Sequence, residues 1–189
     1  MDALQDGQEI VLGGIVTKVK RTTAKKGKSE GERMAILTLE DLQGTCEAVL
    51  FPSVYAAMGH LLAPDRIVFL QGKLDKRREA PSLKVNGVIP VEQAFEVFTS
   101  ALTVAPPAGA DEDWLLQLRA LLREHPGECP VYLEFPDRPA QERTVMVGND
   151  LFVTASDKLV EGLHALAGAS RVQLVARRKI PESVRMAPP

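Results

Sequence analysis

The sequence has no excess of positive charge and few aromatic residues. Its 189 residues include 23 lysine and arginine residues and 25 aspartate and glutamate residues, for a formal net charge of -2. Proteins that bind nucleic acid over most of their surface are usually basic as a whole, so any nucleic-acid site here must be local. Only 5% of the residues are aromatic, so a site that stacks many bases is not expected.

Cysteine and long apolar runs are also scarce. Cys46 and Cys129 stand far apart, and neither has a neighbour at the C-x-x-C spacing of zinc and redox sites. Residues 1–7 are polar and acidic, unlike a signal peptide, and no apolar run approaches the roughly 20 residues that span a bilayer. We therefore expect a soluble cytoplasmic protein without a metal or other cofactor.

Residues 9–90 consist of short apolar runs, rich in β-branched residues, separated by glycine and polar turns. This pattern predicts an all-β unit. The tight-turn sequence at 41–44, opened by an aspartate and closed by a glycine, pairs the second and third strands as a hairpin. The predicted strands are 10–20, 34–40, 45–51, 66–74 and 83–89.

One helix is expected between the third and fourth strands, at residues 52–62. Ser53 can cap it, and its apolar residues recur at helical spacing. Three strands, a helix and two further strands is the order of the five-stranded OB barrel, whose helix closes one end of the barrel. The sequence therefore predicts an all-β five-stranded OB barrel, and we place this domain at residues 1–104.

The pattern changes after Pro90, and the alanine- and proline-rich residues 105–110 indicate a linker. Beyond it we predict a small α+β domain over residues 105–180 and a flexible tail over 181–189. Helices are expected from Asp111 or Asp113 to His125 and from Ser156 to Leu166, a hairpin at 129–135 and 143–147, and a last strand at 171–176.

Positive charge is concentrated in two segments. Residues 18–33 hold seven basic and two acidic residues (+5), and residues 73–84 hold five and two (+3), which leaves -10 for the rest of the chain. In an OB barrel these segments include the loops that flank the oligonucleotide-binding face. The predicted nucleic-acid-binding residues are Lys18, Lys20, Arg21, Lys25, Lys26, Lys28, Arg33, Lys73, Lys76, Arg77, Arg78 and Lys84.

A lysine-rich loop can also be a solvated surface with no ligand. Two basic loops on one predicted face favour binding over that alternative. Phosphates attract such a face regardless of base, so we expect weak binding that falls steeply with added salt. Phe51 and Phe69 are the aromatic candidates of the barrel, but both stand in apolar runs and are predicted to be core residues.

The sequence contains no recognisable catalytic arrangement. His60, His125 and His164 stand on different predicted elements without a carboxylate or cysteine at ligand spacing, so they are assigned to the surface or to helix ends. Asp41 is assigned to a turn, and its neighbour Glu40 points to the opposite face of the strand. There is also no glycine-rich phosphate loop. We expect no catalytic residues and no metal site.

Six motifs follow one another in residues 9–94: GGIVT at 13–17, LTLED at 37–41, EAVLFP at 47–52, DRIV at 65–68, GKLD at 72–75 and VIPVEQA at 88–94. In this order, and with Tyr55 after the third, they closely resemble the OB-fold region of the bacterial DNA polymerase III alpha subunit. From Leu115 onward, the sequence more loosely resembles the small C-terminal domain that follows the barrel in that subunit.

This resemblance implies a barrel near the single-stranded template DNA and a C-terminal domain that contacts the clamp-loader tau subunit. The family's phosphoesterase-like domain, metal-binding palm, fingers and internal clamp-binding peptide lie upstream of the matched region and are missing from this sequence. We therefore expect either a C-terminal portion of a DNA-directed DNA polymerase or a separately encoded relative, unable to polymerise DNA by itself.

Two other functions stay open at this stage. The barrel can serve as a protein-only interaction module of the replisome, with the acidic remainder as a docking surface, and the low aromatic content favours this reading. It can also be an anticodon-binding barrel of a tRNA synthetase, which shares the fold and would prefer RNA. The leading prediction remains single-stranded DNA binding by the barrel.

Overall fold

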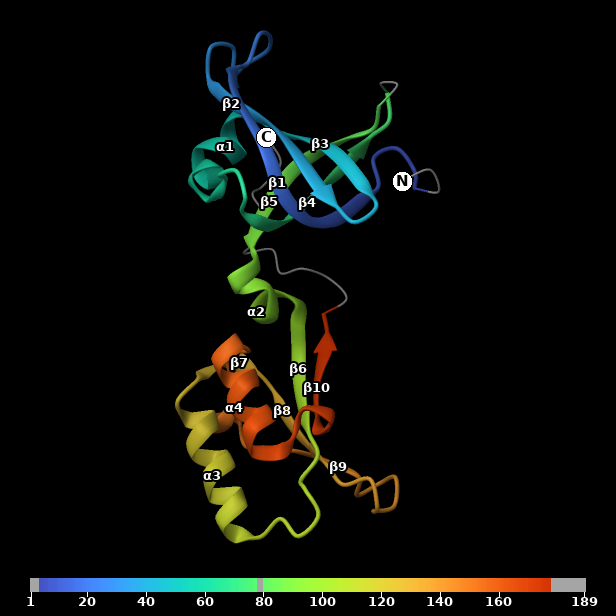
Figure 1. Cartoon of the computed structure of the whole chain (residues 1–189), viewed down its shortest axis with the longest axis vertical. Coiled ribbons are helices and arrows are strands. Elements are labelled where there is room, and N and C mark those ends of the chain that lie inside the picture. The colour runs from blue at the N-terminus through green and yellow to red at the C-terminus, as the bar shows by residue number, and fades with distance from the viewer. Residues whose placement is uncertain (1–3, 78–79, 178–189) are drawn as a thin grey trace. The chain divides into compact units, whose positions relative to one another are not determined.

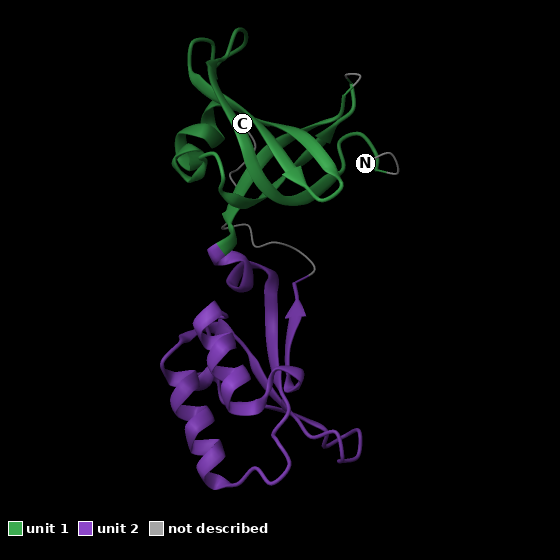
Figure 2. Cartoon of the chain, in the orientation of Figure 1, with its two compact units in different colours: residues 1–91, 181–189 green, residues 92–180 purple. Residues whose placement is uncertain are grey.

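The computed structural model describes residues 4–77 and 80–177, which form two compact units divided between Val91 and Glu92 (Figure 1, Figure 2). The first unit is a closed five-stranded barrel, which confirms the predicted OB barrel. The second contains a small sheet with helices. The tail predicted at 181–189 lies outside the described residues.

The barrel closes in the strand order β1-β2-β3-β5-β4. Neighbouring strands are antiparallel except for β3 and β5, which run parallel. The 15-residue β1 closes the sheet because its first half pairs with β4 and its second half with β2. The strands are β1 (Glu9–Thr23), β2 (Arg33–Asp41), β3 (Gly44–Leu50), β4 (Ile67–Asp75) and β5 (Ser82–Pro90).

The curvature of β1 depends on a glycine and a bulge at the point where the strand changes partners. A Cβ atom at Gly14 would lie 2.5 Å from the carbonyl oxygen of Glu40, so a side chain there would push β1 away from β2. A bulge between Val16 and Lys18 then shifts the register with β2. These two features let one strand serve both edges of the barrel.

The predicted turn between β2 and β3 is confirmed. The Asp41 Oδ1 atom accepts hydrogen bonds from the backbone N–H groups of Gln43 and Gly44, at 2.8 and 3.0 Å. Such an aspartate turn satisfies two backbone donors that the strand ladder leaves open. Asp41 is therefore a structural turn residue, as its position in the sequence suggested.

A short helix, α1 (Pro52–Met58), follows β3 and continues into a 3-10 turn over Gly59–Leu61. Its Val54 is buried in the barrel core. The predicted cap at Ser53 is wrong, because the helix begins one residue earlier, with Phe51 at the N-cap position and no side-chain cap. Pro52, in the first helical position, has no N–H group that would need a capping partner.

The second unit contains a four-stranded sheet in the order β10-β6-β8-β9. β6 and β8 are parallel, whereas the other two pairs are antiparallel. The predicted hairpin is present as β8 and β9. The elements are α2 (Ala94–Phe98), β6 (Thr99–Val104), α3 (Glu112–Arg123), β7 (Pro126–Cys129), β8 (Val131–Glu134), β9 (Thr144–Met146), α4 (Asp157–Ala167) and β10 (Val172–Ala176), with 3-10 turns at Val91–Gln93, Asn149–Leu151 and Ala169–Arg171.

The division between the units falls before the position expected from the sequence, which was near residue 104. The strand β6 is hydrogen-bonded to β10 on one side and to β8 on the other, so it is an inner strand of the second sheet. Residues 105–110, predicted as a linker, instead form a loop within this unit, where the Ala105 N–H donates to the Arg171 carbonyl at 2.8 Å. Proline and alanine suit such a strand-to-helix loop as well as a linker, so composition alone misplaced the boundary.

The two longer helices of the second unit, α3 and α4, begin at predicted capping residues, whereas the short α2 was not predicted. Asp111 Oδ1 accepts a hydrogen bond from the Trp114 N–H at 3.0 Å, and Ser156 Oγ accepts one from the Leu159 N–H at 3.3 Å. The indole of Trp114 donates to the Leu166 carbonyl at 3.1 Å, which links α3 to α4. In the described part of the chain α3, with 12 residues, is the longest helix, and none has the length and apolar character needed to cross a membrane.

Candidate nucleic-acid interface

The outer face of β2 and β3 carries an apolar strip. Alternate residues of β2 from Ala35 to Leu39 are buried, so Met34 and Ile36 point outward. The same alternation in β3 turns Val49 outward, and Phe51 follows on the same face. Phe51 is 40% exposed, so the prediction that it is a core residue is wrong.

These outward residues form the floor of a depression of about 360 Å³, which we call the groove. Its rim is charged, with contributions from β3, from the end of β4 and from β5. A groove with an apolar floor and a charged rim can accept flat apolar rings and charged groups at the same time. The residues that line it are Met34, Ile36, Glu47, Val49, Phe51, Asp75, Arg77, Ser82 and Lys84.

Strand register places lysines on both sides of this floor. Lys20 is paired with Ile36 across β1 and β2, whereas Val49 is paired with Lys84 across β3 and β5. Lys84 is in turn opposite Lys73 of β4. Because directly paired residues point to the same face of a sheet, Lys20, Lys84 and Lys73 all point away from the barrel core. Lys20 and Lys84 flank the floor on its β1 and β5 sides.

The other predicted residues of the first segment lie on the ribbon of β1 and β2 and on its loop. Lys18 is exposed opposite Thr38. Both strands extend further than predicted, so the loop covers only residues 24–32, closed by a 2.9 Å hydrogen bond from the Ala24 N–H to the Glu32 carbonyl. This loop is at the tip of the ribbon (Figure 1). Its exposed basic residues are Lys25, Lys26 and Lys28.

In the second segment, an aspartate holds two of the predicted residues. Asp75 Oδ2 lies 2.8 Å from Arg77 Nη2 and 2.9 Å from Lys84 Nζ, and its Oδ1 accepts a hydrogen bond from Arg77 Nε at 2.9 Å. Hydrogen bonds from Arg77 and then from Lys84 hold the pKa of Asp75 well below its ordinary range. The carboxylate therefore stays charged at neutral pH, and these three side chains add only one net positive charge to the groove.

Three further residues of the second segment complete the predicted set. Lys73 is exposed on β4. Lys76 is partly buried, and its backbone N–H donates to Asp6 Oδ1 at 2.8 Å. Arg78 lies outside the described residues. The structure thus places Lys73 and Lys84 on the outer face, while Lys76 lies where β4 ends.

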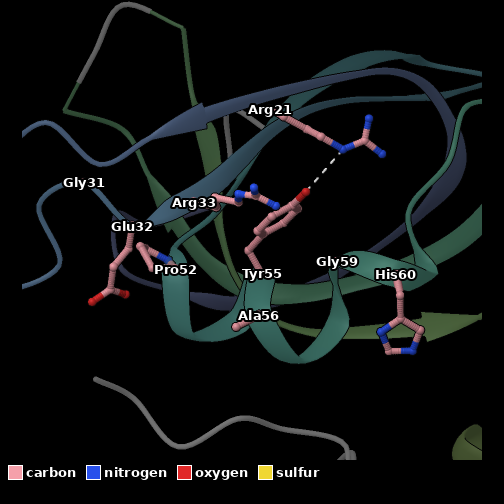
Figure 3. Close-up of a pocket in the computed structure, with 9 residues that line it drawn as sticks. All are labelled: Arg21, Gly31, Glu32, Arg33, Pro52, Tyr55, Ala56, Gly59 and His60. Carbon is pink, nitrogen blue, oxygen red and sulfur yellow. Dashed lines mark hydrogen bonds between the residues drawn. The ribbon is translucent and has the colours of Figure 1, made fainter.

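A second depression, of about 680 Å³, lies between the ribbon of β1 and β2 and the helix α1 (Figure 3). Two predicted residues, Arg21 and Arg33, line it together with Tyr55 and His60. Arg21 Nε donates a hydrogen bond to the Tyr55 hydroxyl at 3.2 Å. Tyr55 was not predicted as a site residue, because helical periodicity cannot show that its hydroxyl meets an arginine from a distant strand.

Phe51, by contrast, could have been found from the sequence. Ala48 and Leu50 are the inward residues of β3, so strict alternation puts the next residue on the outer face. Phe69 is different, because it is partly buried and its ring lies against Gly13, where a Cβ atom would come within 2.8 Å of the Phe69 Cε1 atom. Phe69 therefore packs on the barrel wall and lines neither depression.

Across residues 4–77 and 80–177, no three histidine, cysteine, aspartate or glutamate side chains are arranged to hold a metal ion. His60 is exposed, whereas His125 and His164 are partly buried near the ends of different helices. Burial raises the pKa of the thiols of Cys46 and Cys129. Both thiols therefore stay protonated at neutral pH and are poor nucleophiles.

Comparison with known proteins agrees with the topology of the first unit. Residues 10–91 match the family described as OB-fold nucleic acid binding domain. This match agrees with the strand order of the barrel, which is that of an OB fold. Among solved structures, the S. pombe Stn1-ten1 complex is 17% identical, covers 44% of this chain and 57% of its own, and has a TM-score of 0.36.

Similarity to curated proteins extends over both units. The DNA polymerase III subunit alpha of Halalkalibacterium halodurans is 29% identical over 166 residues, which are 86% of this chain and 14% of that protein. The corresponding subunit of Escherichia coli O157:H7 is 29% identical over 178 residues, which are 92% of this chain and 15% of that protein. The chain thus spans about one seventh of the length of these relatives.

Proposed function

We propose that the first unit binds single-stranded DNA across the outer face of β1, β2, β3 and β5. The observation that carries this proposal is that lysines flank the apolar floor of the groove on both sides. Lys18 and Lys20 contact phosphates on the β1 side. On the β5 side, the cluster of Lys84, Arg77 and Asp75 carries one net positive charge and attracts phosphates more weakly. The lysines come from both basic segments of the sequence, so the charge that is diluted in the whole chain is concentrated at this face.

The bases lie on the apolar floor in this arrangement. Phe51 provides one aromatic platform, and Met34, Ile36 and Val49 provide aliphatic contacts. Stacking on one aromatic ring contributes about 1–3 kcal/mol per base and tolerates every base. With a single ring in the groove, most of the affinity comes from the phosphates, so the binding is sequence-independent and salt-sensitive.

We further infer that the chain acts, in the cytoplasm, as a non-catalytic portion of a replicative DNA polymerase alpha subunit or as its separate relative. Similarity to that subunit over 86 to 92% of the chain supports this role. The barrel then holds the single-stranded template, and the second unit binds the clamp-loader tau subunit or another replisome protein.

Fluorescence anisotropy of a labelled oligothymidylate, titrated with the full chain at two salt concentrations, tests DNA binding. Reversing two charges of the face with Lys18→Glu and Lys20→Glu should weaken binding about a hundredfold at low salt. A control with Arg119→Glu and Lys158→Glu makes the same charge change on exposed residues of the second unit and should bind as the wild type does. Equal affinities for the two double variants would refute the proposed face.

The same titration with an RNA of equal length separates the template role from an anticodon-binding role. In the proposed arrangement the side chains contact phosphates and base rings, and none contacts a 2′-hydroxyl. We therefore expect similar affinity for RNA and DNA, or a preference for DNA. A clear preference for RNA would favour the anticodon-binding alternative.

A protein-docking role for the second unit has its own supporting observation. On α3, Leu115 and Leu116 are 46% and 52% exposed, while Trp114 and Leu118 of the same helix are buried. Exposed leucines beside a packed helix face suit contact with another protein. Leu115→Glu with Leu116→Glu should abolish co-purification with the clamp-loader tau subunit and leave oligonucleotide binding unchanged, whereas retained co-purification would place the partner elsewhere.

A further inference from the structure

The depression beside α1 is distinct from the groove and has its own chemistry. We call it the arginine hollow, and nine residues line it: Arg21, Gly31, Glu32, Arg33, Pro52, Tyr55, Ala56, Gly59 and His60. Unlike the floor of the groove, it presents two guanidinium groups and a phenol, while the imidazole of His60 points away from them (Figure 3). These are the side chains that proteins use to bind phosphate and other oxyanions.

The register of the ribbon explains why two arginines meet there. Arg21 is paired with Ala35, and Arg33 is paired with Thr23, so the two arginines occupy the same face of the ribbon. This is also the face on which Ala35 is buried in the barrel core. Where the ribbon extends past the core, the inward face therefore changes from apolar to basic.

Tyr55 holds the side chain of Arg21 in a defined direction. Its ring packs against the barrel core, and a Cβ atom at position 59 would lie 2.7 Å from the ring, so Gly59 leaves the space that the ring occupies. The hydroxyl accepts the 3.2 Å hydrogen bond from Arg21 Nε. This hydrogen bond involves only the Nε atom of the Arg21 guanidinium group. Its two terminal nitrogens can therefore donate hydrogen bonds to a ligand.

The charge of the arginine hollow is not neutralised by the residues around it. In the part of the chain that the structure describes, neither Arg21 nor Arg33 forms an ion pair with a carboxylate. Glu32 lines the hollow, but its carboxylate points away from both guanidinium groups (Figure 3). Arg77 and Lys84, by contrast, both form ion pairs with Asp75. Two unbalanced guanidinium groups in one hollow create a site that favours an anion.

The arginine hollow adjoins the groove along the chain. Arg33 lines the hollow and the next residue, Met34, lines the groove, while Phe51 lines the groove and Pro52 the hollow. A strand lying on the groove thus reaches the hollow by passing the start of β2 and the end of β3. The two depressions are therefore lined by residues that adjoin in sequence at two places, 33–34 and 51–52.

From these observations we propose that the arginine hollow binds a phosphate group of the nucleic acid whose bases occupy the groove. Arg21 and Arg33 donate to the phosphate oxygens, and Tyr55 positions Arg21. The site marks the point where the strand leaves the outer face. This inference rests on the proposed function of the groove, and the experiment below separates failure of one from failure of the other.

The test compares full-chain variants in the oligothymidylate titration. Arg21→Gln with Arg33→Gln should lower affinity about tenfold and reduce the slope of log affinity against log salt by about 0.7, as expected for one lost phosphate contact of a single strand. Arg119→Gln with Lys158→Gln, the matched control, should change neither quantity. Tyr55→Phe, which keeps the ring, should cause a smaller loss and guards against a double variant that does not fold.

Two oligonucleotides, with and without a 5′-phosphate, identify the source of the phosphate. If the 5′-phosphate raises affinity for the wild type but not for the double arginine variant, the hollow binds the phosphate at a strand end. If the double variant loses the same affinity for both oligonucleotides, the hollow binds an internal phosphodiester. Either result supports the proposal. The proposal is overturned if the Arg21 and Arg33 double variant binds like its control while Lys18→Glu with Lys20→Glu weakens binding. That result would leave the proposed DNA binding by the groove intact.

The reverse pattern, with loss only in the arginine variants, indicates phosphate binding in the arginine hollow but overturns the proposal that the bases of the same strand occupy the groove. If the wild-type chain binds no oligonucleotide, the proposals for the groove and for the arginine hollow are both overturned, and inorganic pyrophosphate then tests only whether the hollow binds an anion. A shift of the Arg21 Nε–Hε resonance on adding pyrophosphate to the wild type, reduced in the single variant Arg33→Gln, supports an anion site in the hollow, and an unshifted resonance in the wild type counts against it.

Discussion

The two basic segments of the chain look alike in sequence and differ in the folded barrel. In residues 18–33 the charged groups extend along a ribbon and its loop, and neither Arg21 nor Arg33 has a carboxylate partner among the described residues. In residues 73–84, Asp75 binds both Arg77 and Lys84. The net charge of +3 already includes Asp75, so what the fold adds is the position of that carboxylate: it lies directly against Arg77 and Lys84 and weakens the attraction of these two cations to phosphate.

The largest effect should come from the first segment. Replacing Lys25, Lys26 and Lys28 by glutamate changes the charge of an exposed loop by six units, so oligonucleotide affinity at low salt should fall by about two orders of magnitude. Anisotropy titrations measure the change. The matched control reverses Arg119, Arg143 and Lys158, which are exposed in the second unit. If both triple variants lost the same affinity, the loop would have no special role.

A smaller effect should separate the apolar floor from the charges. Phe51→Ala removes the one aromatic ring of the groove, and we expect about a tenfold loss of affinity with an unchanged salt slope, since stacking releases no counterions. A variant of the other barrel phenylalanine, Phe69→Leu, serves as the control because that ring lies outside both depressions. A changed salt slope in Phe51→Ala would show that the ring acts on the phosphate contacts.

Removing the carboxylate of Asp75 should leave Arg77 and Lys84 without an ion-pair partner among the described residues, as Arg21 and Arg33 are in residues 18–33, and so strengthen their attraction to phosphate. Asp75→Asn keeps the side-chain shape and frees Arg77 and Lys84, so affinity should rise about threefold and the salt slope should steepen. The same titration series measures both quantities. If affinity fell instead, Asp75 would be required to position the two cations for phosphate, and the segment would bind DNA as a preformed cluster.

The smallest effect concerns stability against pH. The folded-state pKa of Asp75 is depressed by its hydrogen bonds to Arg77 and Lys84, so the stability from this cluster is fully present above the unfolded-state pKa of about 3.9. It is lost as the pH falls from there toward the folded-state pKa. The difference in Tm between the wild type and Asp75→Asn should thus be constant from neutral pH to about pH 5 and shrink below about pH 4. A difference that shrinks between pH 7 and pH 5 would contradict this assignment.

Much of the barrel could be predicted from the sequence because its signals are local. Alternating apolar residues located all five strands, the turn at Asp41 located a hairpin, and Asp111 and Ser156 located two helix starts. The helix cap at Ser53 and the boundary near residue 104 were misplaced. In both cases the same residues suit a second local arrangement equally well. For the helix it is a start with proline in the first turn, and for residues 105–110 it is a loop inside the second unit.

The candidate site shows the same limit. Composition and position along the chain were enough to identify the basic segments and to assign them to one side of an OB barrel. The sequence did not reveal that Asp75 forms ion pairs with two of those cations, that Phe51 lies in the open groove, or that the Tyr55 hydroxyl accepts a hydrogen bond from Arg21. The last of these depends on strand register and helix placement, which join residues 34 positions apart.

The amino-acid sequence by itself determined the strand pattern, the uneven distribution of charge and the helix that follows the third strand. Periodicity and net charge are sums over neighbouring residues, so they can be read without a fold. Tertiary structure alone decided which cations remain unbalanced and which depressions they line. Ion pairs and pockets form between residues that only closure of the barrel brings together, and their strength depends on distances of a few ångströms.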